Sequence, residues 1–300
     1  MSVSVVGLGK IGSALVPRLL CLNQEITVWN RSSDAMERAA ALGAHPVKNA
    51  AKAFAADIVL TALFDDAAVR DIVTPDAISL LGRNGALHIC LSTLSPGLTQ
   101  ELAAAHRDAG AGYVAAPLFG RPEAVAAGAA NICVAGDRSH IETGRAALES
   151  FGRVWNIGED PRLASVAKLC GNFMIGAAIG AMAETAGIMA AEQGDAEAFL
   201  AMMTQTLFSS PIYSNYAPSI LGVRPLPASG LDLPLKDLEL LAHVADRRNV
   251  PTGLLRAMLG NLSLARDNGL GREDWSVALS RLARRQTDMS RNSQSVSKER

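Results

Sequence analysis

The most constraining feature of this chain is a glycine-rich turn between a strand pattern and a helix pattern near its start. The β-branched run at residues 2–6 is followed at once by Gly7, Gly9 and Gly12 in a GxGxxG arrangement, and an amphipathic helical pattern then begins. A strand, this loop and a helix, in that order, are the setting of a dinucleotide-binding loop. The sequence therefore predicts a Rossmann domain, in which parallel strands alternate with helices.

Each glycine of this loop has a separate physical role. Gly7 makes the tight turn, Gly9 lets the backbone approach a pyrophosphate, and Gly12 allows the helix to pack closely on the strand. The helix N-terminus then offers N–H groups and the positive end of its dipole to the phosphates. The predicted cofactor loop consists of Gly7, Leu8, Gly9, Lys10, Ile11 and Gly12.

The end of the second predicted strand indicates which dinucleotide is bound. Residues 25–29 are followed by Asn30, Arg31 and Ser32, with no acidic residue among them. An acid at this place binds the ribose 2′-hydroxyl of NAD, whereas an arginine accommodates the 2′-phosphate of NADP. The sequence therefore favours NADPH over NADH. The alternative is that Arg31 is a solvated loop charge and that Asp34 supplies the acid.

Further strands alternate with helical stretches up to about residue 157. Two buried-strand runs, 57–63 and 86–91, are each followed by polar or turn-forming residues. Ligands of doubly wound sheets bind beyond the carboxyl ends of the strands, so we expect both of these loops to face the cofactor. Two more strand patterns follow at 113–116 and 130–135. The first half is therefore predicted to be an α/β domain with a doubly wound parallel sheet.

A long helix is predicted over residues 161–193. It carries Lys168 and Asn172, which are four residues apart and so share a face. A cation and an amide on one face of an apolar helix either line a site or reach out to solvent. The many glycine and alanine residues of this helix allow other helices to approach closely, so we expect it to be the central helix of an all-helical second domain.

The length of 300 residues favours two domains over one. We predict a nucleotide-binding domain over 1–159, a helical substrate and dimerisation domain over 160–290, and a polar tail without fixed structure over 291–300. Within the helical domain, the apolar periodicity predicts helices at 196–207, 231–249, 251–268 and 273–284.

Composition excludes several classes of protein. The net charge of −1 argues against a basic face for nucleic acid or membrane surfaces. The four cysteines lack the spacing of a metal site or a disulfide framework. No signal segment precedes the first strand, and the longest uncharged part of the long helix, 169–183, is shorter than the ~18 residues of a membrane span. We therefore expect a soluble cytoplasmic protein.

Taken together, five motifs resemble the β-hydroxyacid dehydrogenase family, which includes 3-hydroxyisobutyrate dehydrogenase, tartronate semialdehyde reductase and the glyoxylate and succinic semialdehyde reductases. The resemblance covers the chain from Val3 to about Leu282. It implies a Rossmann domain, a helical second domain, and dimers or tetramers formed through the helical parts. The motifs are GLGKIG at 7–12, STLSP at 92–96, YVAAPLFG at 113–120, AKLCGN at 167–172 and LKDL at 235–238.

The resemblance also implies roles for individual residues. Lys168 matches the catalytic lysine, and Asn172 matches the residue that helps hold the substrate. Thr93 is implied near the nicotinamide, Leu63 along the ribose, and Lys236 in contact with the cofactor. This chemistry is consistent, because hydride addition to a carbonyl leaves charge on the oxygen, and a positioned ammonium can stabilise and protonate it.

The chain departs from the family where the substrate is held. The family usually has Asp-Ala-Pro-Val-Ser-Gly-Gly, whose Ser-Gly-Gly binds a carboxylate, whereas here Ala115 replaces the Asp, Phe119 the Ser and Arg121 the last Gly. A phenyl ring removes one carboxylate donor. Arg121 either restores a donor as a guanidinium or points to solvent. The predicted substrate-binding residues are Ser92, Thr93, Phe119, Gly120, Arg121 and Asn172.

The sequence thus predicts an NADPH-dependent oxidoreductase that acts on a small aldehyde, oxo acid or hydroxy acid. An imine reductase is the first alternative, since such enzymes resemble this family and the segment 271–279 is similar to theirs. Those enzymes generally lack the lysine, so Lys168 favours carbonyl chemistry. A non-catalytic NADP-binding sensor is the second alternative, and it would have no use for Lys168, Asn172 and Lys236 together. The sequence leaves open whether three aromatic residues line the pocket: Tyr213, Tyr216 and Trp275.

Overall fold

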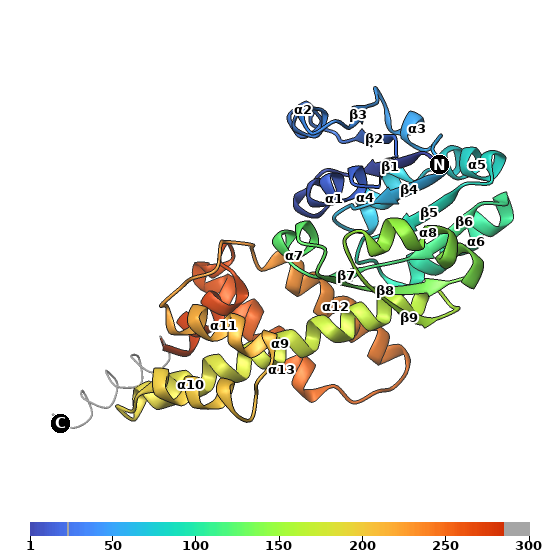
Figure 1. Ribbon diagram of the computed structural model, residues 1–300. Coiled ribbons are helices and arrows are strands. Elements are labelled where there is room, and N and C mark those ends of the chain that lie inside the picture. Colours follow the sequence, from blue (N-terminus) through green and yellow to red (C-terminus); the bar gives the residue numbers. More distant parts are fainter. Residues whose placement is uncertain (23, 285–300) are drawn as a thin grey trace. The chain divides into compact units, whose positions relative to one another are not determined.

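The computed structural model describes residues 1–22 and 24–284, and the chain divides into two units, Met1–Lys168 and Leu169–Arg300 (Figure 1). The division lies inside the helix α9 (Arg162–Ala191), whereas the predicted boundary after residue 159 lies just before that helix. The predicted tail at 291–300 lies outside the described residues.

The first unit is built on a sheet that begins in Rossmann order. Its strands follow the order β3-β2-β1-β4-β5-β6-β8-β7, with β9 paired to β8. The six strands from β3 to β6 are mutually parallel, and the order reverses between β1 and β4, which is where doubly wound sheets bind their ligands. The predicted Rossmann fold is confirmed. The strands are β1 (Val3–Val6), β2 (Ile26–Trp29), β3 (His45–Pro46), β4 (Ile58–Thr61), β5 (Leu87–Cys90), β6 (Gly112–Ala115), β7 (Leu118–Phe119), β8 (Ala130–Gly136) and β9 (Gly152–Gly158).

The edge of the sheet beyond β6 is mixed, which the sequence analysis did not anticipate. Strand β8 runs antiparallel to both β6 and β7, and β9 runs parallel to β8. A parallel pair needs a crossover that usually contains a helix, and α8 (Arg138–Glu149) provides it between β8 and β9. Between β7 and β8 the chain makes only the short helix α7 (Pro122–Ala126) and then reverses direction.

Helices cover both faces of the sheet because its strands alternate their side chains between two cores. Val3 and Val5 of β1 belong to the core under α1 (Lys10–Leu20), α2 (Ser33–Ala41) and α8. Val6 belongs to the opposite core, under α5 (Pro75–Asn84) and α6 (Pro96–Ala109). Two short helices complete this unit, α3 (Ala50–Ala53) and α4 (Asp66–Ile72) (Figure 1).

The second unit is helical, as predicted. Its helices are the later part of α9, α10 (Ala196–Gln205), α11 (Pro211–Leu221), α12 (Asp232–Arg247), α13 (Gly253–Ala265) and a helix over residues 275–284. The sequence analysis missed α11, although Pro211 occupies a first-turn position and Gly222 ends the helix in a left-handed conformation. Both are standard boundary signals of a helix.

The small residues of α9 have the predicted effect, because other helices approach them closely. A Cβ atom at Gly176 would lie 3.3 Å from the Trp275 ring, and one at Gly180 would lie 2.8 Å from the Met258 sulfur. Tyr216 contacts Trp275 edge-on with ring centroids 6.4 Å apart, and Tyr213 packs against the same core. These three aromatic side chains therefore contribute to the packing of the helical unit.

The helix α9 meets the length and composition of a membrane-spanning helix, with a mean hydropathy of 1.5 over its most apolar window. The sequence analysis considered only its longest uncharged part, whereas this window also admits charged residues. Within the structure 39% of the window is buried, and the central helix of a water-soluble protein meets the same criteria. The composition of α9 alone therefore does not indicate a membrane protein.

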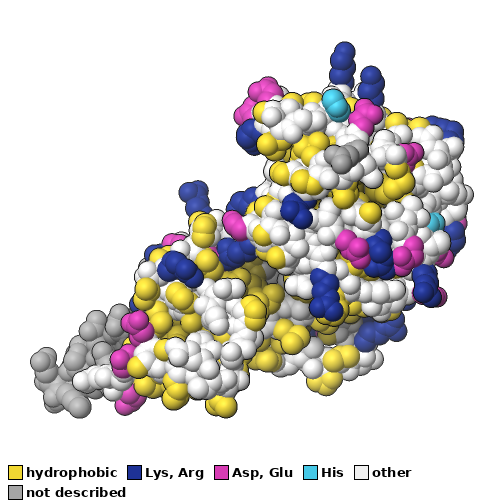
Figure 2. All heavy atoms as spheres, viewed as in Figure 1, with side chains coloured by type: hydrophobic (Ala, Val, Ile, Leu, Met, Phe, Trp, Pro, Cys, Tyr) yellow, Lys and Arg dark blue, Asp and Glu magenta, His cyan; other side chains and the backbone are white. Residues whose placement is uncertain are grey.

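Charged side chains of both signs are interspersed over the face of the molecule in Figure 2. This distribution agrees with the net charge of −1 for the whole chain. Apolar side chains also reach the surface of the helical unit, among them Met174 and Ile188 of α9, which are 69% and 62% exposed.

Candidate cofactor and catalytic site

The glycine loop begins with a turn that only glycine tolerates. Gly7 has a φ of +93°, and a Cβ atom there would lie 2.5 Å from the carbonyl oxygen of Ala62. The Gly7 N–H donates to the carbonyl oxygen of Trp29 at 2.9 Å. Where the loop leaves β1, it therefore lies in close contact with the ends of both β2 and β4.

The other two glycines of the motif meet opposite surroundings. A Cβ atom at Gly12 would lie 1.8 Å from the Gly7 carbonyl oxygen, so α1 packs directly on the loop. A Cβ atom at Gly9 would meet nothing within 4 Å. Gly9 is also the N-cap of α1 and has no side chain to bind the first N–H groups of the helix. An open approach beside helix N–H groups fits the phosphates of a dinucleotide.

The remaining loop residues differ in what they expose. Leu8 is buried, and its N–H donates to the side-chain oxygen of Asn30 at 3.0 Å. Ile11 is half-buried and packs against the core of the sheet unit, while Lys10 is exposed. Of these side chains, Lys10 is the one presented to solvent next to the open face at Gly9.

Asn30 positions the loop from the end of β2. Its Oδ1 accepts from Leu8, and its Nδ2 donates to the Ser32 hydroxyl at 2.9 Å. Arg31 and Ser32 are exposed directly after the strand, and Asp34 lies in the first turn of α2. The side chains of Arg31 and Ser32 are thus exposed where a 2′-phosphate is predicted, while the contact itself stays a prediction.

The loops after β4 and β5 are joined to each other by hydrogen bonds at the carboxyl ends of these strands, while the expectation that both face the cofactor stays a prediction. The Leu63 N–H donates to the Ser92 hydroxyl at 2.9 Å. The backbone N–H and hydroxyl of Ser95 donate to the Asp66 carboxylate at 2.9 and 2.5 Å. The Ser92 hydroxyl thus links the two loops, and the residue is only 5% exposed. Substrate binding by Ser92 stays a prediction. Thr93 is half-buried beside it.

Lys168 lies in the sheet unit, where its ammonium faces an aromatic ring. The Nζ atom is 4.1 Å from the centroid of the Phe119 ring. An ammonium over a ring face is attracted by the quadrupole of the ring. Phe119 is the last residue of β7, which follows shortly after the carboxyl end of β6. This contact therefore lies near the carboxyl ends of the parallel strands, where the glycine loop also lies. Gly120 and Arg121 follow, exposed and half-buried, and Arg121 is the N-cap of α7.

Cys133 of β8 also lies close to this ammonium. Burial raises the pKa of the Cys133 thiol, and the charge of Lys168 opposes part of that rise. The thiol stays protonated at neutral pH and is an apolar neighbour of the lysine. The sequence analysis assigned no role to Cys133, since its distance along the chain from Lys168 gave no signal of proximity.

In the helical unit, Asn172 and Lys236 meet at a buried carboxylate. The Asn172 Nδ2 donates to Asp237 Oδ2 at 2.6 Å, and the Lys236 ammonium lies 2.8 Å from Asp237 Oδ1. The Asp237 side chain is 1% exposed and that of Lys236 is 21% exposed. The structure thus brings together two residues that the sequence analysis selected and adds Asp237, which it missed. The available signal was its position on a predicted helix, four residues before Leu241, which is buried. Residues four apart share a helix face, so this spacing places Asp237 on the buried face.

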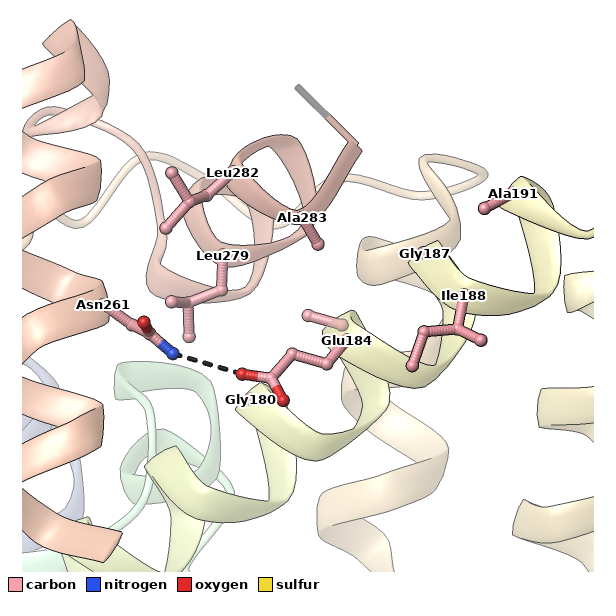
Figure 3. A pocket seen from close by; sticks show the side chains of 10 residues that line it. Gly180, Glu184, Gly187, Ile188, Ala191, Asn261, Leu279, Leu282 and Ala283 are labelled. Carbon is pink, nitrogen blue, oxygen red and sulfur yellow. Dashed lines mark hydrogen bonds between the residues drawn. The ribbon is translucent and has the colours of Figure 1, made fainter. Parts of the chain in front are cut away.

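The helical unit also contains a hollow of about 420 Å³ between α9, α13 and the helix over 275–284 (Figure 3). Its lining is mostly apolar, and Glu184 accepts a hydrogen bond from the Asn261 side chain at 3.1 Å across it. No predicted site residue lines this hollow, so the chemistry is assigned to the sheet edge and the lysines described above. The lining residues are Gly180, Ala183, Glu184, Gly187, Ile188, Ala191, Asn261, Leu279, Leu282 and Ala283.

Comparison with known proteins identifies both parts of the chain. Residues 2–166 match the NAD-binding domain of 6-phosphogluconate dehydrogenase, and residues 163–282 match the NAD-binding domain of NADP-dependent 3-hydroxyisobutyrate dehydrogenase. The chain is 31% identical over 287 residues to an uncharacterized oxidoreductase of Bacillus subtilis, covering 93% of this chain and 99% of that protein. It is 28% identical to the 3-sulfolactaldehyde reductase of Escherichia coli, covering 93% and 94% of the two chains.

Solved structures agree on the fold. The crystal structure of 3-hydroxyisobutyrate dehydrogenase from Salmonella typhimurium superposes with a TM-score of 0.82 at 24% identity, covering 93% of this chain and 99% of that one. The imine reductase from Myxococcus stipitatus in complex with NADP⁺ superposes with a TM-score of 0.63 at 25% identity, covering 94% and 99%. The fold is thus shared by enzymes that reduce different kinds of double bond.

Proposed function

This chain belongs to the β-hydroxyacid dehydrogenase family of NAD(P)-dependent oxidoreductases, and on that premise we propose that it reduces a small aldehyde or ketone with NADPH, using Lys168 as the proton donor. The reverse reaction, oxidation of the corresponding hydroxy compound, uses the same groups. Asn172 is proposed to help hold the substrate, one helical turn beyond the lysine.

The observation that carries this proposal is the place of the Lys168 ammonium within the sheet unit. It lies 4.1 Å from the ring that ends β7, near the carboxyl edge where the open glycine loop lies. A proton donor for carbonyl reduction has to lie near the end of the cofactor that reacts. Thr93 and Leu63 at the same edge are proposed to line the nicotinamide and ribose, and Lys236 is proposed to reach the cofactor.

When held at the glycine loop, NADPH would supply the hydride that adds to the carbonyl carbon in the proposed reaction. The Lys168 ammonium donates a hydrogen bond to the carbonyl oxygen, stabilises the charge that develops there, and transfers its proton to that oxygen. The neutral amine then takes a proton from water. Phe119 and Cys133 lie close to the ammonium, and apolar surroundings would strengthen its interaction with the developing charge.

Replacing the lysine tests this role. We expect Lys168→Met to lower kcat for carbonyl reduction ~10²- to 10⁴-fold, which is the usual contribution of a general acid, with NADPH affinity nearly unchanged. Steady-state NADPH oxidation with glyoxylate, succinic semialdehyde and butanal, together with NADPH binding by fluorescence, measures both quantities. Lys52→Met, at an exposed lysine, is the matched control. Turnover of a cyclic imine that survives in Lys168→Met would point instead to imine reduction.

The preference for NADPH is proposed to depend on Arg31. It is exposed after β2, beside the Asn30 side chain that fixes the loop. Loss of one charge-assisted contact to the 2′-phosphate should raise the Kd of NADPH ~10- to 100-fold in Arg31→Gln and leave that of NADH unchanged. Arg38→Gln, at an exposed arginine of α2, is the control. Equal loss of NADH binding would show that Arg31 does not contact the 2′-phosphate.

We also propose that the helical unit forms a homodimer or homotetramer. Met174 and Ile188 leave large apolar side chains exposed on α9, where a second copy would cover them. The molar mass of the purified protein, measured by light scattering, should therefore exceed the 31.4 kDa of one chain. Ile188→Lys is expected to shift the protein toward the monomer, and a monomeric wild type would contradict the proposal.

A further inference from the structure

We propose that Phe119 makes this site selective for carbonyl compounds whose substituent is uncharged and apolar, against those whose substituent carries a carboxylate. This inference rests on the proposed function, because it assumes that the carbonyl oxygen binds the Lys168 ammonium. It concerns the substrate class, which the family assignment leaves open.

First, the Phe119 ring lies within reach of a carbonyl compound bound to Lys168. The Phe119 ring centroid lies 4.1 Å from Lys168 Nζ. A carbonyl oxygen that accepts a hydrogen bond from this ammonium lies about 3 Å from it. If the carbonyl oxygen approaches the ammonium from the side of the ring, the substituents of that carbonyl come within van der Waals contact of the ring. Phe119 is half-buried, so part of the ring remains available for such a contact.

The second step is a matter of chemistry. A phenyl ring has no hydrogen-bond donor, and its face carries the negative end of the quadrupole. A carboxylate placed against it loses water and gains no partner from this side chain. Cys133, which also lies close to the ammonium, is buried and its thiol stays protonated. An alkyl or aryl substituent instead gains apolar contact with the ring and the thiol.

The third step concerns the ammonium itself. A carboxylate near Lys168 would be attracted to its charge and would compete with the carbonyl oxygen for the same donor. Such a complex places the wrong oxygen on the proton donor and is not productive. The charge of Lys168 therefore favours binding of an oxo acid but does not favour its reduction.

Arg121 is the residue that would overturn this inference. It lies two positions beyond Phe119 as the N-cap of α7, and a guanidinium can bind a carboxylate with two parallel hydrogen bonds. If Arg121 performed this role, the enzyme would prefer carboxylate substrates in spite of the phenyl ring. The test therefore includes both residues.

The experiment compares butanal with succinic semialdehyde, which has a carboxylate in place of the terminal methyl group. We measure kcat/KM with NADPH for both aldehydes in the wild type, Phe119→Ser, Phe119→Leu and Arg121→Gln. The ratio between two substrates in one preparation does not depend on the fraction of active protein, so partial misfolding of a variant does not change it. NADPH binding by fluorescence shows that each variant retains its sheet unit.

We expect the wild type and Phe119→Leu to prefer butanal, since both place an apolar side chain beside the lysine. Phe119→Ser should shift the ratio toward succinic semialdehyde by ~10- to 100-fold, the usual effect of a hydrogen bond to a charged group. Arg121→Gln should leave the wild-type ratio unchanged.

Three results would overturn the inference. These are a preference of the wild type for succinic semialdehyde, an unchanged ratio in Phe119→Ser, and loss of turnover of the carboxylate substrate alone in Arg121→Gln. In each case carbonyl reduction would still stand, because one of the aldehydes is turned over. Absence of NADPH oxidation with either aldehyde would instead remove the proposed function, and the inference would fall with it.

Discussion

The two units bury their polar side chains in different ways. In the sheet unit, Thr61, His88 and His106 form a fully buried chain of neutral groups. In the helical unit, the buried carboxylate of Asp237 binds one ammonium and one amide. The contrast matters because adding a proton breaks the first arrangement, whereas removing a charge breaks the second.

The carbonyl group at the end of the hydrogen-bonded series Thr61, His88 and His106 determines which atom donates in each hydrogen bond. His106 Nδ1 lies 2.7 Å from the Leu102 carbonyl oxygen, which can only accept, so this nitrogen carries the proton. Nε2 of His106 therefore accepts from His88 Nδ1 at 3.0 Å. Nε2 of His88 in turn accepts from the Thr61 hydroxyl at 2.9 Å. Each ring thus has one nitrogen that donates a hydrogen bond and one that accepts, so both rings are neutral.

Burial keeps this chain neutral. It lowers the pKa of His106 to about 4 and that of His88 well below its usual value, with the neighbouring His106 adding to the shift of His88. The titratable neighbours do not supply a countercharge, since burial raises the pKa of both Tyr113 and Cys90. A proton added to either histidine would therefore be an unpaired buried charge.

The helical unit satisfies its buried group with charge instead. One oxygen of Asp237 accepts from Asn172 and the other faces Lys236, whose side chain is 21% exposed. Breaking such a pair by neutralising one partner leaves donors without their acceptor. The two units should therefore respond differently to acid and to charge-removing substitutions.

The largest expected effect is a loss of stability of the sheet unit in acid. Both histidines have a folded-state pKa below the unfolded value of ~6.5, so the unfolded chain binds more protons as the pH falls. Their contribution is complete above pH ~6.5 and is lost as the pH falls toward 4. At pH 5 the free energy of unfolding should be lower by about 2 kcal/mol through His106, and His88 should add a further loss in the same direction. Urea unfolding from pH 8 to pH 5 measures this slope.

His106→Gln and His45→Gln form a matched pair for this prediction. The first removes a buried histidine and should reduce the pH slope, while the second replaces an exposed histidine and should leave it unchanged. An equal slope in all three proteins would show that the neutral chain does not govern acid stability.

The second largest effect is expected in the helical unit, from Asp237→Asn. The substituted amide keeps the shape of the carboxylate, but its NH₂ group must face either the Asn172 amide or the Lys236 ammonium, both of which are donors. We expect a loss of about 2–3 kcal/mol in the free energy of unfolding. Calorimetry at pH 7 measures it.

Glu239→Gln is the control for this substitution, because Glu239 is exposed on the same helix and the same charge is removed. Its effect should stay within about 0.5 kcal/mol. If the two variants lost the same stability, net charge would be responsible and the buried cluster would not.

The fold and the cofactor loop could be predicted because their signals are local. The conformation of Gly7 and the close packing at Gly12 concern residues adjacent in the chain, and they leave a short motif in the sequence. The order of the parallel strands follows from the alternation of strand and helix patterns. The antiparallel edge at β8 could not be predicted in this way, since strand direction there depends on the path of the connection after β7.

The contacts within the candidate site could not be predicted, because they join distant parts of the chain. The ring of Phe119 on β7 meets Lys168 on α9, and Asn172 on α9 meets Asp237 on α12. The sequence identified three of these residues by type and by resemblance but not their partners. The neutral histidine chain escaped notice because a lone histidine in an apolar strand run, such as His88, has no distinctive spacing.

The smallest expected effect separates a hydroxyl that belongs to the neutral chain from one that does not. Thr61→Val removes the first donor and leaves His88 Nε2 without a partner, whereas the methyl groups keep the shape of the side chain. We expect a loss of about 1 kcal/mol in the free energy of unfolding. Thr27→Val on β2 is the matched control, because the Thr27 hydroxyl is buried and has no hydrogen-bond partner among the described residues. That substitution should be neutral or slightly stabilising, since it removes an unsatisfied polar group. Equal losses from both variants in urea unfolding at pH 8 would mean that β-sheet packing at threonine, and not the histidine chain, determines the effect.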